Sequence, residues 1–442
     1  MESTTYTPDL QQAYQQAKIE AINSLQTAAL ACLKESIEES IRLSKISLDI
    51  DNSFSKCYAN LAFFLAQALQ LEPALQAMNK AINIDPHVPE YYCMRSILLS
   101  GLGYIDEAIA NYHKCIEINP DTIGAKFNLG CLLYLKGKYR EGMELMESRF
   151  LFAETISNFR KRFLAPDWDG KASLEGKTLL IYNEQGMGDA IQYLRYIPKL
   201  PPCHLIVEIQ EEIAPLMEGF FDKIITRPSD YVDYQVQPIK CDYVVSFSSL
   251  TYLMDPNLES IPECPYLAIP SSNIPSTKLK VGLIWAGGIL HANDSTRSMP
   301  VQLLLPLSEI PGIQYYSLQK GCLIRQEKDL NQGRFDMIDL SPLLTDFSIT
   351  REILNELDLL ISVDTATVHL AGAMGKPVWM MTAFCNDHRW LKDREDSPWY
   401  PSLRIFRQKS YGDWNSVVSQ IKEALIKKMT GLEPKPTLNS PN

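Results

Sequence analysis

A glycine-rich turn that ends in an aspartate follows the apolar run TLLIYN at residues 178–183. It contains Gly186, Gly188 and Asp189, and a helical pattern begins there. Similar turns cradle phosphate in dinucleotide-binding proteins, but the third glycine of that fingerprint is missing and Tyr193 stands where the helix should approach closely. We therefore do not expect the turn to cradle a cofactor phosphate, and interpret it as one that aims Asp189 at another kind of site. The alternative is that Asp189 only stabilises the start of the helix.

A second group of candidate residues follows the apolar run LDLLISV, at the expected junction of a strand and a helix. The first N–H groups of a helix and its positive dipole end favour a bound anion. We therefore predict that Thr365, Ala366 and Thr367 bind a diphosphate. Asp364 is predicted either to cap the helix or to accept a hydrogen bond from a ligand hydroxyl. His369, one turn into the helix, is either a core histidine or a ligand contact.

A third group lies in the polar loop HANDSTRSMP and the strand end before it. Arg297 offers two parallel N–H groups to phosphate oxygens and keeps its charge throughout a reaction. The alternative is a solvated surface arginine. Gly287 either lets the backbone approach a ligand or simply turns the chain.

The block FCNDHRWLKDREDSPWY, residues 384–400, is dense in charged and aromatic residues. Trp399 is a candidate to stack on a ligand ring, and Asp387, Arg389 and Trp390 are candidates to line the same site. A folded structural corner explains the composition equally well.

Residues 364–372, DTATVHLAG, resemble the nucleotide-diphosphate motif D-T-G-x-x-H-L-x-A of family 9 glycosyltransferases, the ADP-heptose type heptosyltransferases, with Ala366 in place of the glycine. The resemblance implies a GT-B fold, in which two Rossmann-like domains enclose a cleft, and metal-independent sugar transfer with inversion. It also implies that Arg297 reaches the donor phosphates and that Asp189, after Gly188, is the general base.

The elements that position these residues are short apolar runs typical of parallel strands covered on both faces. Four of them precede the Pro- and Ser-rich stretch near residue 270 and six follow it, which predicts two doubly wound sheets. The first four span residues 178–183, 204–209, 223–227 and 242–247; the second six span 280–285, 313–319, 335–340, 357–363, 377–383 and 403–408.

The first third of the chain repeats every 34 residues. Small residues keep this interval in three series, which are Ala28, Ala62, Ser96 and Gly130; Ser40, Ala74, Ala108 and Gly142; and Ser47, Ala81 and Cys115. Two amphipathic helices that cross at small side chains, with Pro86 or Pro120 ending a unit, predict a helical solenoid. These residues resemble the tetratricopeptide repeat, which implies either a groove that holds a protein or peptide, or a solenoid that only caps or dimerises the chain.

The segments VGLIWAGGILHANDSTRSMP and DREDSPWYPSLRIFRQ resemble tetratricopeptide proteins with a family 9-like domain. We therefore predict an α + α/β architecture, a helical solenoid followed by a GT-B fold. Its parts are a helical lead-in at 1–20, repeats at 21–156, a linker at 157–177, an acceptor domain at 178–272, a donor domain at 278–410, a helix at 411–430 and a disordered tail at 431–442.

Composition narrows the possible partners. A formal net charge of −11 disfavours a nucleic-acid binder, and the apolar runs are too short to span a membrane. The N-terminus carries no secretory signal pattern, so we expect a cytoplasmic protein. The ten cysteines never form a C-x-x-C pair and the six histidines are scattered, so we expect buried thiols, no metal and no cofactor.

Together these patterns predict a hexosyl- or heptosyltransferase-type enzyme that moves a sugar from a nucleotide-diphosphate donor to a hydroxyl, on a protein or peptide held by the repeats. The competing prediction is a tetratricopeptide scaffold whose transferase-like domain has lost activity and binds partners or senses sugar nucleotides. Ala366 favours the scaffold, while Asp189, Arg297, Asp364 and His369 favour the enzyme.

Overall fold

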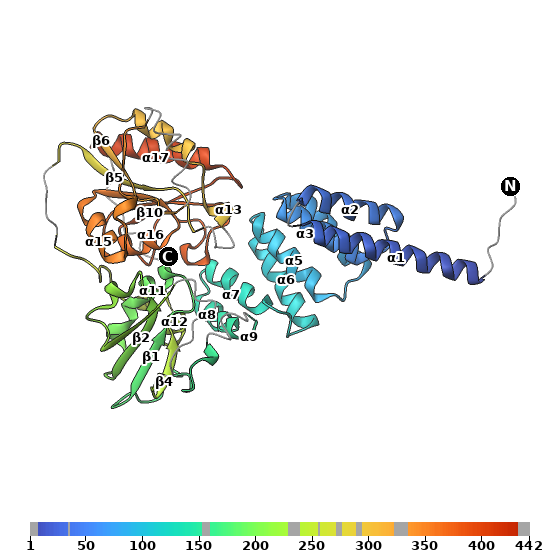
Figure 1. The fold of residues 1–442 in the computed structure, drawn as a ribbon, viewed down its shortest axis with the longest axis horizontal. Helices are drawn as coiled ribbons and strands as arrows, with labels where there is room; N and C mark the ends of the chain where they lie inside the picture. Colours follow the sequence, from blue (N-terminus) through green and yellow to red (C-terminus); the bar gives the residue numbers. More distant parts are fainter. Residues whose placement is uncertain are drawn as a thin grey trace. The chain divides into compact units, whose positions relative to one another are not determined.

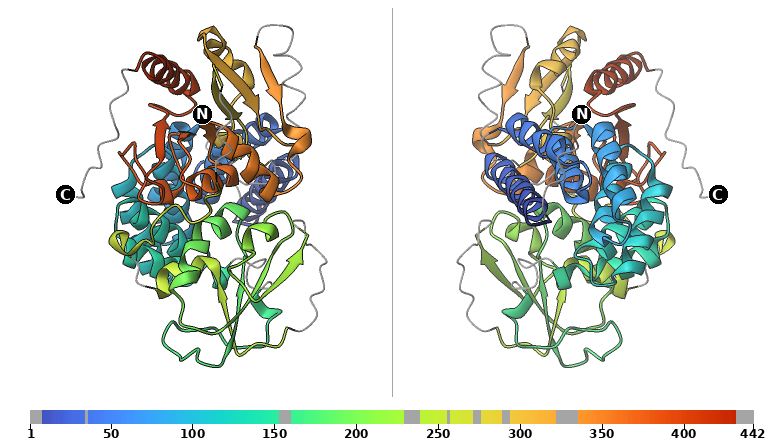
Figure 2. Two further views of the ribbon diagram at one scale, coloured as in Figure 1. Left: turned by 90° about the vertical axis from the view of Figure 1, so that its left-hand side faces the viewer. Right: turned by 90° about the vertical axis from the view of Figure 1, so that its right-hand side faces the viewer.

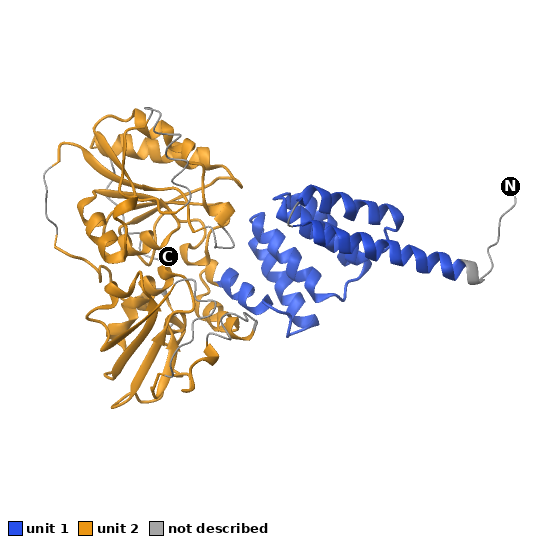
Figure 3. Cartoon of the chain, viewed as in Figure 1, with its two compact units in different colours: residues 1–133 blue, residues 134–442 orange. Residues whose placement is uncertain are grey.

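The computed structural model describes residues 8–33, 36–152, 160–228, 239–254, 257–270, 276–288, 294–321 and 335–431. The chain divides into two compact units, Met1–Leu133 and Tyr134–Asn442 (Figure 3). The predicted tail at 431–442 lies outside the described residues except for Gly431.

Unit 1 consists of helices that pack as successive antiparallel pairs. They are α1 (Pro8–Cys32), α2 (Ile37–Ile50), α3 (Ser55–Gln67), α4 (Leu71–Ile84), α5 (Pro89–Gly101), α6 (Ile105–Ile118) and α7 (Ala125–Leu135), which runs across the unit boundary. α2, α4 and α6 end just before Asp51, Asp85 and Asn119, each an extended C-cap residue. Pro86 and Pro120 directly follow two of these caps, so each of the two prolines lies at the end of a repeat, as predicted.

The predicted small-residue series explains why these helices pack closely. Ala62, Ser96, Ala74, Ala108 and Cys115 are fully buried. The first repeat differs, because Ala29 rather than Ala28 is buried, and its carbonyl accepts a hydrogen bond of 2.8 Å from the Ser40 hydroxyl of α2. The lead-in predicted at 1–20 is not separate either, since α1 continues from Pro8 into this first repeat.

Unit 2 contains two parallel sheets, seen as the green and the yellow-to-red layers of Figures 1 and 2. The first has the order β3-β2-β1-β4. Its strands are β1 (Thr178–Tyr182), β2 (His204–Gln210), β3 (Lys223–Arg227) and β4 (Tyr243–Ser246). The inner strand residues alternate between two buried clusters, so this sheet is covered on both faces as predicted.

One face of the first sheet packs on α11 (Met187–Tyr193) and α12 (Phe247–Leu253). The stretch predicted as a linker packs on both faces. Phe163 joins Leu180 and Tyr182 in the cluster on the other face, while Trp168 and Leu174 join the cluster on the α11 side. The Trp168 backbone N–H also donates to the carbonyl of Val244 in the edge strand β4, at 2.8 Å. Within 160–177 the chain is therefore part of this lobe rather than a spacer, because both apolar faces of the sheet have to be buried.

The second sheet has the order β10-β9-β8-β5-β6-β7. Its strands are β5 (Leu279–Ile284), β6 (Ile313–Ser317), β7 (Met337–Asp339), β8 (Leu359–Val363), β9 (Val378–Thr382) and β10 (Leu403–Arg407). Read from β7, this is the six-stranded dinucleotide-fold order 3-2-1-4-5-6. α17 (Trp414–Met429) covers one face, while α15 (Phe347–Glu356) and α16 (Ala366–Ala373) cover the other. The predicted fold class is confirmed.

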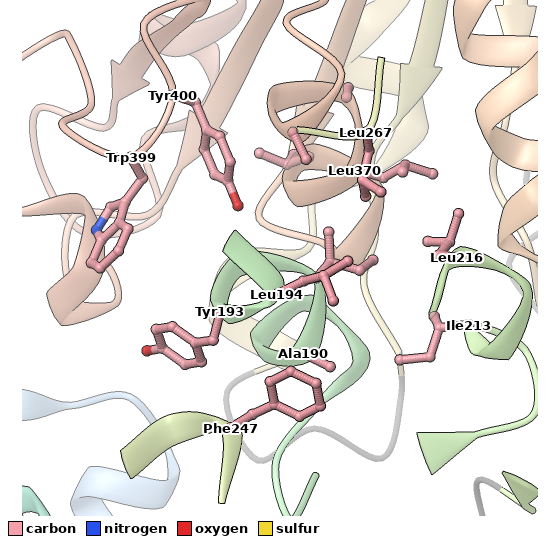
Figure 4. Close-up of a cluster of buried hydrophobic side chains, with 14 of the residues drawn as sticks. Ala190, Tyr193, Leu194, Ile213, Leu216, Phe247, Leu267, Leu370, Trp399 and Tyr400 are labelled. Carbon is pink, nitrogen blue, oxygen red and sulfur yellow. The ribbon is translucent and has the colours of Figure 1, made fainter. Parts of the chain in front are cut away.

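The two sheets of unit 2 share one hydrophobic cluster around α11 (Figure 4). Ala190, Tyr193 and Leu194 from the first lobe lie in the same cluster as Leu370, Trp399 and Tyr400 from the second. α11 and α16 are thus packed together, which brings the beginnings of these two helices to one place. The unit boundary at Leu133 places α8 (Tyr139–Met146) and α9 (Arg149–Phe152) with the sheets, whereas the sequence predicted repeats to residue 156.

Candidate functional site

The second sheet reverses its strand order between β5 and β8, and ligands of open parallel sheets bind beyond the carboxyl ends of such strands. Arg297, at the end of α13 (Asp294–Arg297), lies at this edge, and its Nη1 donates to the carbonyl oxygen of Asp364 at 3.3 Å. A Cβ on Gly287 would lie 2.4 Å from Arg297 Nη2. Position 287 is therefore glycine because the guanidinium crosses directly over its backbone, and the predicted group of Gly287, Arg297 and Asp364 is assembled.

The start of α16 is where the sequence predicts an anion site. The first N–H groups of any helix, here including those of Ala366 and Thr367, lack intrahelical acceptors. Thr365 is the extended N-cap residue, and its side chain makes no capping hydrogen bond to them. Asp364 does not cap the helix. Its Oδ2 instead accepts a hydrogen bond of 2.8 Å from Trp390 Nε1. Burial raises the pKa of Asp364 to about 6, and the charge of Asp387 adds to this rise.

The first sheet reverses its order between β1 and β4, and the turn after β1 leads into α11. The Asn183 side chain holds this turn by donating to the carbonyl of Gln185 at 3.0 Å and to Gln210 Oε1 at 3.0 Å. Gly186 is the N-cap of α11, and Asp189 lies in the first turn. Asp189 is not a cap; its Oδ1 forms an ion pair of 2.8 Å with Arg389 Nη2 from the second lobe.

Arg389 joins the two lobes. It lies in the short helix η6 (His388–Trp390), and its three nitrogens contact three side chains. Besides Asp189, Nη1 donates to Gln192 Oε1 at 3.1 Å and Nε donates to Asp387 Oδ1 at 2.9 Å. Burial alone would lower the pKa of Arg389, but Asp189 and Asp387 hold it well above its ordinary value, so the guanidinium is fully charged.

Gly188 explains how closely the two lobes meet. A Cβ on it would lie 2.8 Å from His369 Cδ2 and 3.4 Å from the Cα of Ala366. A side chain at position 188 would therefore push α11 away from the start of α16. The predicted anion site and the predicted base are thus on adjoining helices.

His369 and Trp399 are packing residues in this structure. His369 is 2% exposed, stacks on Trp390 with ring centroids 5.2 Å apart and pairs through Nδ1 with the Tyr400 hydroxyl at 3.0 Å. Burial holds the pKa of His369 well below its ordinary value, so the ring is neutral. Trp399 is 1% exposed, contacts Tyr193 edge-on and donates from Nε1 to the carbonyl of Arg389. It has no open face for a ligand ring and instead supports the segment that carries Arg389.

The edge of the first sheet beyond β1 and β4 holds a buried polar cluster built on Arg149 of α9. Its Nε pairs with Glu184 Oε1 at 3.0 Å, and its Nη2 donates to Ser249 at 2.7 Å and to Ser246 at 3.3 Å. Arg149 also pairs with Glu147. Glu184 precedes the turn that leads to Asp189, so the segment after the solenoid helps to hold that turn.

Gln192 of this site carried no sequence signal, and Arg389 and Tyr400 carried only a weak one, the density of charged and aromatic residues in their block. The Gln192 side chain is fully buried, and its Nε2 has no partner among the described residues. Across the same residues, no cluster of three or more His, Cys, Asp or Glu side chains is arranged to hold a metal ion. Nor does any helix in the described ranges combine the length and apolar character needed to cross a bilayer.

Comparison with known proteins identifies the repeats. A tetratricopeptide repeat family model matches residues 89–122, the region of α5 and α6. Protein FlbA of Caulobacter vibrioides is 25% identical over 444 residues, which cover 92% of this chain and 72% of FlbA. A protein O-mannosyl-transferase of Homo sapiens is 28% identical over 88 residues, 19% of this chain and 10% of that protein.

Among solved structures, a mutant O-GlcNAc transferase of Thermobaculum terrenum aligns over 84% of both chains with 13% sequence identity and a TM-score of 0.32. The repeat period, the paired helices and the family match agree with one another. The chain is a tetratricopeptide-repeat protein whose second unit is built on two parallel sheets of the Rossmann type.

Proposed function

We propose that the chain is an inverting, metal-independent glycosyltransferase that moves a sugar from a nucleotide-diphosphate donor to a hydroxyl of a protein or peptide held by the repeats. The observation that carries the proposal is the meeting of α11 and α16. It brings the Asp189 carboxylate of one lobe to the helix start and Arg297 of the other, as a two-lobed transferase of the family 9 type requires.

Each residue then has a defined task. The acceptor O–H gives its proton to Asp189 while its oxygen bonds to the anomeric carbon, and the bond from that carbon to the diphosphate oxygen breaks. Attack from the side opposite the leaving group inverts the anomeric carbon. Arg297 and the first N–H groups of α16 take up the charge of the departing diphosphate, so no metal is needed for that step.

The competing function, a scaffold that binds sugar nucleotides without transfer, is favoured by one observation. Asp189 is ion-paired with Arg389, so its Oδ1 is occupied by a guanidinium N–H rather than open to an acceptor hydroxyl.

The test measures sugar transfer from ADP-, GDP- and UDP-sugars to proteins of a cell extract. We expect Asp189→Asn and Arg297→Gln to lower transfer at least about a hundredfold, the effect of removing a general base or a charge-stabilising donor. Asp169→Asn and Arg404→Gln are matched controls, because both side chains lie in exposed ion-pair or turn contacts away from the site. A parent that binds a nucleotide but transfers no sugar would establish the scaffold instead.

A further inference from the structure

Each of the three guanidinium nitrogens of Arg389 has a side-chain partner, and these partners are not equivalent. Asp387 lies two residues away on the same segment, and its Oδ1 also accepts from the Arg389 backbone N–H at 3.1 Å. Asp189 comes from the other lobe, and a single ion pair of 2.8 Å joins it to Arg389. The Asp387 contact is therefore maintained by local geometry, whereas the Asp189 contact lasts only while α11 stays in place.

A donor phosphate at the start of α16 would enter the surroundings of Arg389. Arg297 Nη1 donates to the carbonyl of Asp364, the residue directly before the α16 N-cap, at 3.3 Å. Trp390, the neighbour of Arg389 in η6, donates to the Asp364 carboxylate at 2.8 Å, so the segments that carry both arginines contact this helix start. The buried Nε2 of Gln192, unpaired among the described residues, is one more donor beside Arg389. The excess of acidic side chains around Arg389 means that an incoming anion has to compete with a carboxylate for it.

Building on the proposed function, we propose that Arg389 exchanges partners: it releases Asp189 and binds a phosphate of the nucleotide donor, so that donor binding unmasks the base. Asp387 keeps the arginine on its own lobe during the exchange. The acceptor hydroxyl then meets a free carboxylate only when a donor is present, which makes donor binding the first step of the reaction.

The exchange predicts that substitutions at positions 189 and 389 have non-additive effects on nucleotide affinity. Binding measurements can test this without an assay of sugar transfer. We would determine the Kd of ADP, GDP and UDP by calorimetry at one pH and ionic strength for the parent, Asp189→Asn, Arg389→Gln and the double variant. Removing the competing carboxylate should tighten nucleotide binding roughly tenfold, within the usual range of coupling between sites. Arg389→Gln should weaken it, and in that background Asp189→Asn should have little further effect.

Asp169→Asn is the charge control. It removes an exposed carboxylate that accepts from the backbone N–H groups of Lys171 and Ala172, so it leaves both Arg297 and Arg389 untouched. If Asp189→Asn tightens binding equally with and without Arg389, or does not tighten it at all, the exchange is refuted. It is refuted as well if none of the three nucleotides binds the parent or Asp189→Asn. Circular dichroism and urea melts establish that each variant is folded.

The exchange and the proposed transfer can fail separately. Coupling in the binding cycle without sugar transfer would retain the exchange and make the chain a nucleotide sensor. Transfer without coupling would retain the glycosyltransferase and overturn the exchange.

Discussion

Replacing Gly188 with alanine tests whether close approach of α11 and α16 holds the site together. The new methyl carbon would lie 2.8 Å from His369 Cδ2 and 3.3 Å from its Nε2, whereas carbon atoms at optimal contact are about 3.5–4.0 Å apart. The imidazole cannot move away freely, because it is stacked on Trp390 and bonded to the Tyr400 hydroxyl. The lobes must therefore separate by roughly half an ångström or more at this point.

The expected cost follows from two opposing effects. Overpacking of this kind destabilises proteins by about 1–3 kcal/mol. Alanine is a better helix former than glycine by at most about 1 kcal/mol, which offsets part of that cost. We expect Gly188→Ala to lose about 1–2 kcal/mol of unfolding free energy. The larger effect should be on transfer, since displacing a catalytic group by about 1 Å can cost on the order of a hundredfold in rate.

Urea melts and the sugar-transfer assay check the two expected effects, with Gly101→Ala in α5 of unit 1 as the control. A Cβ at position 101 would meet only the flexible Leu71 side chain, at 3.1 Å. We expect Gly101→Ala to stay within about 0.5 kcal/mol of the parent. If Gly188→Ala and Gly101→Ala have the same stability and the same transfer rate, the tight contact between α11 and α16 does not position the site.

Three further predictions concern single residues. The pKa of Asp364 is raised from 3.8 to about 6 in the folded state, so the stability that its protonated form contributes is complete below pH 4 and lost as pH rises through 6. Urea melts from pH 4 to 7 should show this loss, at most about 3 kcal/mol, in the parent but not in Asp364→Asn, and equal pH slopes would contradict it. Arg149→Met should lower the free energy of unfolding by about 3–5 kcal/mol, because it leaves the buried Glu184 carboxylate without its arginine. Adding Glu184→Gln should restore part of that stability, and a urea melt of the double variant that shows no recovery would refute the pairing argument. Trp399→Phe should lower the free energy of unfolding by about 1 kcal/mol through the lost hydrogen bond to the Arg389 carbonyl, and an unchanged urea melt would contradict its packing role.

Much of this architecture could be predicted from local patterns. The interval of 34 residues marked the solenoid, because small side chains are required wherever two helices cross, and Ala62, Ala74 and Ser96 are indeed fully buried. All ten predicted strands form, because continuous apolar runs suit strands covered on both faces. Asp189, Arg297 and Thr365 could be predicted as site candidates because each follows or faces the carboxyl end of such a strand.

Tertiary structure alone decided which of these residues meet. Arg389 pairs with Asp189, two hundred positions away, and no periodicity encodes that pairing, because it depends on how the two lobes pack. Tertiary contacts within the lobes also give Asp364 an indole partner in place of a helix cap and pack residues 160–177, a predicted linker, against the first sheet. Trp399 is buried by contacts with both lobes. Local sequence specifies the strand ends that carry polar side chains, while burial and charge pairing between distant segments determine what those side chains contact.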